Sequence, residues 1–376
     1  MGTVLQFSNQ FASADGHGIA RYSREMHAAM VDHTDWTITP VAGWSNLPPA
    51  KLERLKQTSG LKLTGLGRRA TPLLWTYLDW PTVEARVDRD ADIVHAMSLG
   101  YPIATRKPYV VTVHDLGPLT HPEYFSNTRP WVMERSLRQA EQRAAAIVCV
   151  SQSTADEVTS YLGAGVSDRL HVVGEGVSGE FFDPVPAPDF SDLDLPPDGV
   201  PFILSAGKMS PRKNLQGVVR GLRKICDEVP HHLVIVGGRG WDWDVLDREL
   251  QSPEVRERVH VNGFVTDEQL RALYGRAAAY IHPSLYEGFG LTVLEAMAAG
   301  APVIASRTTS LPEVAGDAAI LIDPTDDNGL AQAMLDILTD EHRAQTLVAK
   351  GKARAASFQW SDCAKAMAAL YDGVLS

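Results

Sequence analysis

The stretch that decides the fold of this chain is HPSLYEGFGLTVLEAMAAG at residues 282–300. An apolar strand ends near His282, a loop with Gly288 and Gly290 follows, and a helical pattern runs from Leu291 to Gly300. Glycines allow the backbone to come close to a ligand, and the free N–H groups and dipole of a helix N-terminus favour an anion. The stretch therefore predicts a strand–loop–helix unit with a diphosphate site at the start of the helix.

Two glutamates flank this predicted anion site. Glu287 lies in the loop, and Glu295 lies a little over one turn into the helix. Carboxylates do not help to bind phosphate. They can accept hydrogen bonds from sugar hydroxyl groups on either side of the anion site. The alternative is an ordinary turn with surface glutamates, which Glu295 disfavours because it interrupts the apolar face of a helix expected to be buried.

The same alternation of short apolar strands and longer helical patterns extends over both halves of the chain, which is typical of parallel sheets covered by helices. The expected strands are 4–8, 93–96, 109–114, 146–150, 170–173, 202–206, 232–236, 259–262, 279–282, 302–306 and 319–322. Helices are expected at 19–30 and 129–143, after a capping box at Thr266/Gln269, and from about Ser361 to the end. A Pro- and Asp-rich stretch at residues 183–201 interrupts the pattern and has the composition of a linker.

We therefore predict an α/β protein with two Rossmann-like domains whose parallel sheets face each other across a cleft, a common place for a ligand. The expected parts are an N-terminal domain at 1–185, a linker at 186–200, a second domain at 201–358 and a last helix at 359–376.

A second candidate phosphate site is GKMSPRKN, residues 207–214, which follows a predicted strand and precedes a helix. Its cations Lys208, Arg212 and Lys213 suit the oxygens of a diphosphate. In isolation an exposed basic loop would be the ordinary interpretation. Its place at the carboxyl end of a strand favours the binding site.

The first half offers two further positions on strand ends. The loop DGHGI at 15–19 places Gly16 and Gly18 before a helix, and His114 ends the strand PYVVTVH. A lone histidine is more often structural, but the end of a strand in this architecture favours function, so both interpretations of His114 remain open.

Two tempting motifs are set aside. Gly174–Gly179 matches the dinucleotide pattern GxGxxG, but EFFDP follows it instead of a helix. The Asp-x-Asp pairs beginning at Asp88, Asp90, Asp192 and Asp242 lack further carboxylates in an arrangement that would hold Mg²⁺. We interpret them as solvated surface and expect no metal site.

Composition narrows the class of protein. The formal net charge of −11 argues against a nucleic-acid partner. The three distant cysteines indicate a reducing, cytoplasmic compartment, and neither a signal peptide nor a membrane-spanning run is visible. Residues 51–70 carry six cations against one glutamate, which would suit peripheral docking on the anionic inner face of the cell membrane. A solvated helix pair would show the same pattern.

At these residues the sequence resembles glycosyltransferase family 4, whose members are retaining enzymes with the GT-B fold. The resemblance covers nearly the whole chain and rests on YEGFGLTVLEAMAAGAPVIAS, SAGKMSPRKN, NGFV, SLPEVAGDAAILIDP, GIARYSREM, VTVHDLGPLTHPEYF and VSQSTADEV. It is strongest to bacterial mannosyltransferases that build lipopolysaccharide or exopolysaccharide. The last helix is similar to the family helix that crosses back onto the first domain.

The resemblance also implies roles for single residues. Glu287 would hold hydroxyls of the donor sugar, Glu295 the ribose, and His114 would face the sugar. Lys213 would bind the diphosphate with Arg212, and Lys208 stands where the family more often has arginine. The remaining donor-binding positions are Gly16, Gly18, Val265 near the base, and Gly288, Phe289, Gly290 and Leu291, whose amides would meet the diphosphate.

The activity implied is hexosyl transfer with retention, with α-mannosyl from GDP-mannose as the best guess, onto a glycan or polyprenyl-linked glycan in surface polysaccharide synthesis. No carboxylate nucleophile is evident, so the departing diphosphate would help to accept the acceptor's proton. Neither a metal nor a cofactor besides the nucleotide sugar is expected. Alternatives are a UDP-sugar enzyme of the same fold, a sugar-nucleotide epimerase, a glucan phosphorylase and a catalytically silent binding partner.

Overall fold

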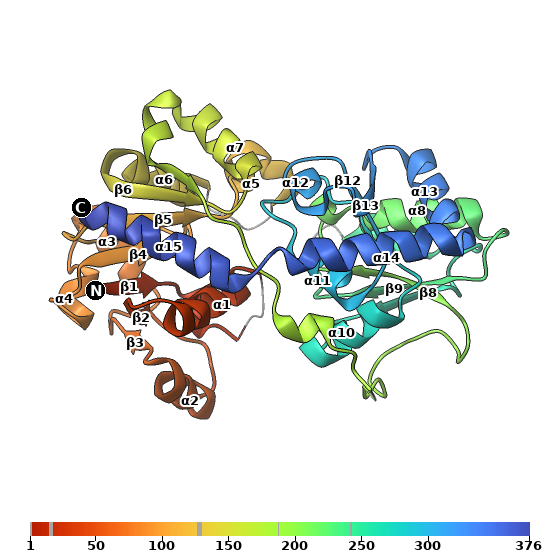
Figure 1. The fold of residues 1–376 in the computed structure, drawn as a ribbon, viewed down its shortest axis with the longest axis horizontal. Coiled ribbons are helices and arrows are strands. Elements are labelled where there is room, and N and C mark those ends of the chain that lie inside the picture. The colour runs from red at the N-terminus through yellow and green to blue at the C-terminus, as the bar shows by residue number, and fades with distance from the viewer. Residues whose placement is uncertain (1, 15–17, 126–129, 187, 241–242) are drawn as a thin grey trace. The chain divides into compact units, whose positions relative to one another are not determined.

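The computed structural model describes residues 2–14, 18–125, 130–186, 188–240 and 243–376. The chain divides into two units. Unit 1 comprises the described residues of Met1–Pro122, Asn127–Gly176 and Gln359–Ser376, and unit 2 those of Glu123–Ser126 and Val177–Phe358. Each unit holds one parallel sheet with helices packed on it (Figure 1).

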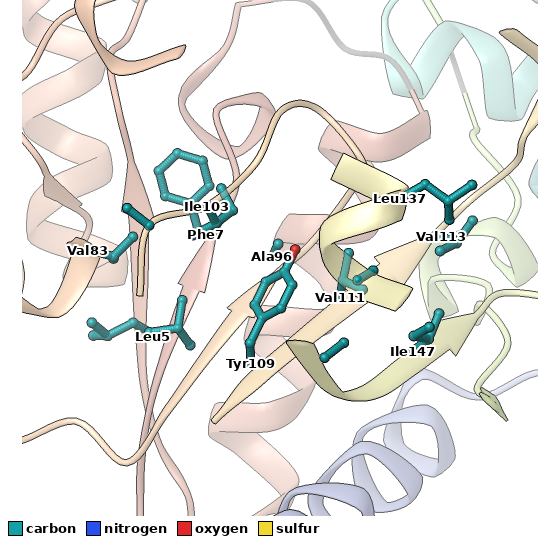
Figure 2. Packing of buried hydrophobic residues seen from close by; sticks show 14 of the residues in the cluster. Leu5, Phe7, Val83, Ala96, Ile103, Tyr109, Val111, Val113, Leu137 and Ile147 are labelled. Carbon is teal, nitrogen blue, oxygen red and sulfur yellow. The ribbon is translucent and has the colours of Figure 1, made fainter. Parts of the chain in front are cut away.

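Unit 1 has a seven-stranded sheet in the order β3-β2-β1-β4-β5-β6-β7. Its strands are β1 Thr3–Phe7, β2 Thr37–Ala42, β3 Lys62–Leu63, β4 Ile93–Ala96, β5 Tyr109–Val113, β6 Ala144–Cys149 and β7 Leu170–Val172. Its helices are α1 Gly18–His33, α2 Pro49–Ser59, α3 Ala70–Leu78, α4 Val83–Val87, α5 Gly117–Thr120, α6 Pro130–Arg143, α7 Gln152–Leu162 and α15 Trp360–Leu375. Figure 2 shows how side chains such as Leu5, Val111 and Leu137 fill the core between strands and helices.

Unit 2 has a six-stranded sheet in the order β10-β9-β8-β11-β12-β13. Its strands are β8 Phe202–Ala206, β9 His232–Val236, β10 Val259–Asn262, β11 Ala279–His282, β12 Val303–Ser306 and β13 Ala319–Ile322. Its helices are α8 Leu215–Ile225, α9 Trp243–Leu250, α10 Asp267–Arg276, α11 Leu291–Ala299, α12 Leu311–Ala315, α13 Asp327–Thr339 and α14 Glu341–Ala356. The predicted capping box is confirmed, with Thr266 and Gln269 bonding each other's backbone.

The predicted α/β class with two parallel sheets is confirmed, and so is the return of the last helix to the first unit. In Figure 1 α15 runs beside α1. The hydroxyl of Tyr371 on α15 lies 2.6 Å from Nδ1 of His95 in β4. Burial lowers the pKa of His95 to about 3, so its ring is neutral and the bond joins two uncharged buried groups.

Two strands of unit 1 are not among the expected ones. β2 contains Pro40, which has no N–H for a sheet partner, and the two-residue β3 pairs with β2 only at Val41 and Ala42. The outer side of β2 is therefore unpaired around Pro40, as befits a proline in a sheet. β3 is a two-residue edge strand, and Thr and Pro interrupt the apolar pattern of β2, so neither strand shows the continuous apolar run by which most other strands are visible in the sequence.

The division between the units falls at Gly176, earlier than residue 185. Residues 179–182 form a 3₁₀ turn whose Phe181 ring lies 6.3 Å from that of Tyr274 in unit 2. The chain returns to unit 1 at Gln359, and a Cβ at Gly176 would lie 2.4 Å from the backbone nitrogen of Trp360. Gly176 of the GxGxxG match is thus required by close packing, and no α-helix follows it.

The Pro- and Asp-rich stretch is anchored to unit 2. The N–H of Asp194 donates to Oδ1 of Asn262 in β10, and Nδ2 of Asn262 donates to the carbonyl of Asp194. Both hydrogen bonds are 2.8 Å long. Its carboxylate lies 2.9 Å from Nδ1 of His260. Gln269 donates to the carbonyl of Asp189. The stretch has the irregular backbone expected of a linker, yet these bonds hold it along β10 and α10.

Candidate functional site

The loop after β8 brings a buried lysine to the carboxyl end of the unit 2 sheet. Gly207 has φ = 138°, a value that side chains strongly disfavour, and a Cβ there would lie 3.2 Å from Cε of Lys213. A single 3₁₀ turn, Pro211–Lys213, then turns the chain into α8. The absence of a side chain at Gly207 therefore leaves room for the Lys213 stem, which is only 8% exposed.

Lys213 and Arg212 both bind the carboxylate of Glu287 in the loop after β11. Nζ of Lys213 lies 2.5 Å from Oε1 of Glu287, and Nη1 of Arg212 lies 2.7 Å from Oε2. Arg212 also donates to the carbonyl of Tyr286 at 2.9 Å. β8 and β11 are neighbours in the sheet, so their loops meet although the residues lie 74 positions apart.

His282, at the end of β11, completes this cluster. Its Nε2 lies 3.0 Å from Oε1 of Glu287 and 3.2 Å from Oγ of Ser284, while Nδ1 lies 3.0 Å from the hydroxyl of Tyr280. The sequence showed His282 only as a strand end. The signal that could have marked it is its spacing, five residues before Glu287 across one tight loop.

The electrostatics of the cluster follow from burial and from its two cations. Burial opposes ionisation of Glu287, but Arg212, Lys213 and His282 together hold the pKa of Glu287 well below its usual 4.5. Burial lowers the pKa of Lys213 to about 8, with Glu287 opposing and Arg212 adding to this shift. Burial and the nearby Lys213 lower the pKa of His282 to about 4. At neutral pH the cluster therefore contains one carboxylate, two cations and a neutral imidazole.

A neighbouring loop fixes the backbone between Glu287 and the helix. Oγ of Ser310 lies 2.6 Å from the carbonyl oxygen of Phe289 and 3.0 Å from that of Glu287, so its one hydroxyl hydrogen is within reach of both. The N–H of Glu287 donates to Thr309 Oγ1. Gly290 caps α11 with φ = 121°, and a Cβ there would lie 2.7 Å from Leu311. The strand, the glycine loop and the helix start at Leu291 lie where the sequence predicted them. The amides of Gly288–Leu291 thus stand at a fixed helix N-terminus, which favours an anion.

The other predicted positions in unit 2 differ in their exposure to solvent. Glu295 is 2% exposed inside α11, so it does not lie on the surface. Lys208 is exposed, unlike Lys213 of the same loop. Val265 is half-buried after β10, and its neighbour Phe264 is 72% exposed with its ring over Gly238, where a Cβ would lie 2.5 Å from it.

His114 lies in unit 1 and contacts a buried carboxylate that the sequence analysis missed. Its Nδ1 is 3.4 Å from Oε1 of Glu175, its Nε2 is 3.0 Å from the carbonyl of Met97, and its ring packs edge-on against Tyr22 at 4.6 Å. Gly18 is the first residue of α1, and Gly16 lies outside the described residues. Glu175 was hidden within the rejected GxGxxG match.

Three of the Asp-x-Asp residues accept hydrogen bonds within the protein. Asp92 accepts from the N–H of Thr3, Asp88 from that of Asp90, and Asp192 from Gln269. Asp242 lies outside the described residues. Within the described part of the chain, no group of three or more His, Cys, Asp or Glu side chains is placed to hold a metal ion.

Comparison with protein families assigns both halves of the chain. A model described as "Glycosyl transferases group 1" matches residues 189–354, and one described as "Glycosyltransferase Family 4" matches residues 17–181. O-antigen chain mannosyltransferase B of Escherichia coli is 34% identical over 259 residues, which cover 68% of this chain and 67% of that protein. The chain belongs to the family 4 glycosyltransferases.

Other relatives and solved structures agree with this membership. The serotype-specific mannosyltransferase WbdA of Escherichia coli is 34% identical over 68% of this chain, a match that spans 32% of the length of WbdA. Sucrose-phosphate synthase from Thermosynechococcus elongatus superimposes with a TM-score of 0.73 at 20% identity, covering 100% of this chain and 99% of that one. WaaG, a glycosyltransferase involved in lipopolysaccharide biosynthesis, gives 0.70 at 13% identity, covering 96% and 97%.

Because the sequence identities to the solved structures are low, these structures are evidence for the fold alone. They confirm the predicted GT-B fold of this glycosyltransferase. The family models confirm the predicted enzyme class, a hexosyltransferase. A nucleotide-sugar donor and a glycan acceptor follow as substrate classes. None of the helices in the described residues combines the length and the low polarity that crossing a bilayer requires.

Proposed function

We propose that this glycosyltransferase transfers an α-mannosyl group from GDP-mannose, with retention, to a glycan or polyprenyl-linked glycan during bacterial surface polysaccharide synthesis. The observation that carries the proposal is the ion-pair cluster of Arg212 with the buried Lys213 and Glu287, beside the N-terminus of α11. Two cations and a helix start provide positive charge for a diphosphate. The names of the mannosyltransferase relatives support the choice of sugar and pathway.

In this proposal the leaving diphosphate displaces part of the Glu287 ion pairs. Arg212 and Lys213 are held in place before the donor arrives, so stabilising the charge that develops on the leaving group needs little reorganisation. Glu287 then accepts hydrogen bonds from hydroxyls of the sugar. The amides of Gly288, Phe289, Gly290 and Leu291 bind the phosphate oxygens.

The remaining roles rest on the family resemblance. Glu295 would bind the ribose, Val265 would lie at the base and Lys208 at the diphosphate, while His114, Gly18 and Gly16 would serve the donor from unit 1. Since the reaction needs only the nucleotide sugar and the acceptor, the proposal includes no cofactor. We place the reaction in the cytoplasm, at the inner face of the cell membrane.

A thermal-shift panel tests the donor. GDP and GDP-mannose should raise the unfolding temperature more than UDP, ADP and their sugars at equal concentration, because a ligand that binds only the folded state stabilises it by mass action. Calorimetry should give the same order of affinity. A preference for UDP would replace GDP-mannose by a UDP-sugar and leave the site unchanged. Absence of any nucleotide response, together with absence of transfer, would contradict the proposed function.

A further inference from the structure

Large apolar side chains are exposed together on one region of unit 1. Within the described residues nine large hydrophobic side chains are exposed, and five of them come from α3, the residues just after it, and α6. Trp80 is 66% exposed and Tyr77 is 60% exposed, which is unusual for aromatic side chains. We call these five the aromatic patch: Leu73, Tyr77, Leu78, Trp80 and Trp131.

Arg135 links the part of the patch on α3 to the part on α6. Leu73 and Tyr77 are four residues apart and so share one face of α3. The guanidinium of Arg135 on α6 lies 5.2 Å from the centre of the Tyr77 ring and donates a 3.1 Å hydrogen bond to the carbonyl of Thr76. Trp131 precedes Arg135 by four residues and so lies on the same face of α6.

The exposed residues are not needed to hold α3 on the unit. The opposite face of α3 carries Thr71 and Trp75, which are 0% and 2% exposed. Nε1 of Trp75 donates a 2.7 Å hydrogen bond to the carbonyl of Pro81, which fixes the segment that carries Trp80. α3 is therefore already packed, and the patch is an additional surface on a firm support.

The charges around the patch are mainly positive. α3 has no charged residue, and Arg69 directly precedes it. The carboxylate of Asp79, beside Trp80, is paired with both Arg106 and Arg143. On α6 the acidic Glu141 is paired with Arg138 at 3.0 Å. The other acidic residue of α6, Glu134, is half-buried and accepts a hydrogen bond from the hydroxyl of Tyr161. Cations therefore border the patch on a chain whose net charge is −11.

We propose that the aromatic patch inserts into the interface of an anionic lipid bilayer. Trp and Tyr favour the boundary between headgroups and acyl chains, because their rings are apolar and their N–H and O–H groups remain hydrated. Arginines at the border attract anionic headgroups. An exposed apolar surface of this kind marks a protein or membrane contact, and its cationic border on an acidic chain favours the anionic bilayer.

This surface is distinct from the basic segment 51–70. Leu52, Leu55 and Leu63 of that segment pack against a small core that includes Phe11 and Leu61, so its apolar side chains are not available to lipid. Insertion of the aromatic patch should therefore resist salt, whereas an electrostatic contribution of residues 51–70 should be screened.

Vesicle co-sedimentation tests the proposal with the full-length chain. The lipids are phosphatidylglycerol and phosphatidylethanolamine in equal parts, with phosphatidylcholine vesicles as comparison. The variant Leu73→Ser/Tyr77→Ser/Trp80→Ser should lose at least about tenfold in affinity for the anionic vesicles, since the apolar area it could bury is removed. The control Val31→Ser/Leu375→Ser changes two exposed apolar side chains of unit 1 outside the patch and should bind like the wild type.

A second measurement reports insertion itself. Lipids brominated on the acyl chains should quench tryptophan fluorescence of the wild type, and Trp80→Phe/Trp131→Phe should lose most of that quenching. Equal vesicle binding by the serine variant and wild type, or equal quenching in the phenylalanine variant, would overturn the proposal. So would a wild type that ignores vesicles but forms a dimer that the serine variant loses, because the patch would then join two copies of the chain.

These outcomes are independent of the proposed transfer reaction. The patch residues have no place in the candidate donor site, so the serine variant should bind GDP in calorimetry like the wild type. Loss of vesicle binding with normal nucleotide binding supports the patch alone. An unchanged unfolding temperature of the variant shows that unit 1 remains folded.

Discussion

Nζ of Lys213 lies 2.5 Å from Oε1 of Glu287, and both side chains are almost fully buried. The pair joins the loop after β8 to the loop after β11 at the carboxyl edge of the unit 2 sheet. A buried ion pair of this kind contributes little net stability, because desolvation of both charges offsets their attraction. Arg212 gives Glu287 a second cation, so the cluster is positive as a whole and suits an anionic ligand.

Removing one partner of this pair should reduce both stability and turnover. Lys213→Gln and Glu287→Gln should each lower kcat by about a hundredfold or more, as loss of one preorganised electrostatic group does. Each should also destabilise the fold by up to about 3–5 kcal/mol, since a buried charge loses its partner. Steady-state kinetics and denaturant unfolding measure the two effects.

The double variant Lys213→Gln/Glu287→Gln separates the effect on stability from the effect on turnover. Removing both charges should restore much of the stability, while kcat should stay as low as in the single variants. Recovery of kcat together with stability would show that the cluster serves the fold and not the transfer reaction.

Activity should fall at alkaline pH. The pKa of Lys213 is lowered to about 8, so its protonated fraction, and with it the cation at the diphosphate, declines as pH rises through about 8. The pKa of Glu287 is held well below 4.5, so this carboxylate stays ionised on the acidic side of neutrality. The profile of kcat/KM against pH reports groups of the free enzyme and should show this alkaline limb.

Lys213→Arg provides the control for this profile, because arginine keeps its charge at any pH used. Its remaining activity should be flat across the limb that the wild type shows. An alkaline limb of the same position in both proteins would assign the titration to another group.

Transfer should survive chelation of metal ions. Arg212 and Lys213 provide the positive charge at the proposed diphosphate site, so EDTA should change kcat/KM by less than about twofold, a free-energy difference below 1 kcal/mol. The assay uses enzyme dialysed against EDTA, with Mg²⁺ or Mn²⁺ added back. Complete loss of activity and its return with either ion would show that a metal ion acts with these side chains.

Residues 51–70 should add a salt-sensitive attraction to anionic vesicles. Changing Lys51, Arg54, Lys56, Lys62, Arg68 and Arg69 to Gln should weaken binding at low ionic strength, since each cation near an anionic leaflet contributes roughly 1 kcal/mol. Because the Debye length contracts to roughly 3 Å at 1 M salt, wild type and variant should then bind alike.

Co-sedimentation at two ionic strengths measures this difference. The matched control changes six exposed cations of unit 2 to Gln, at Lys224, Arg248, Arg256, Arg276, Arg343 and Lys352. Equal binding by wild type and the 51–70 variant at low salt would show that this segment is only a solvated face.

The sequence by itself determined most of the strands of this protein and the local geometry of several loops. The eleven expected strands all exist, and most of them are short apolar runs such as β4, β5 and β11, which the parallel sheets bury on both faces. The turn from β11 into α11 was also readable, since Gly290, Leu291 and Gly300 act through local backbone geometry. The cations at 208–213 and the glutamates at 287 and 295 could be named from the sequence as candidate site residues, but the residues that they contact could not.

Only the tertiary structure decided which of these residues meet. β8 lies between β9 and β11, so Lys213 reaches Glu287, which is 74 positions away in the sequence. Lys208 of the same loop remains exposed. In unit 1 the approach of β5 to the segment after β7 pairs His114 with Glu175. Strand order is set by packing over the whole sheet, and no local pattern encodes it. That is why the residues could be named from the sequence and their contacts could not.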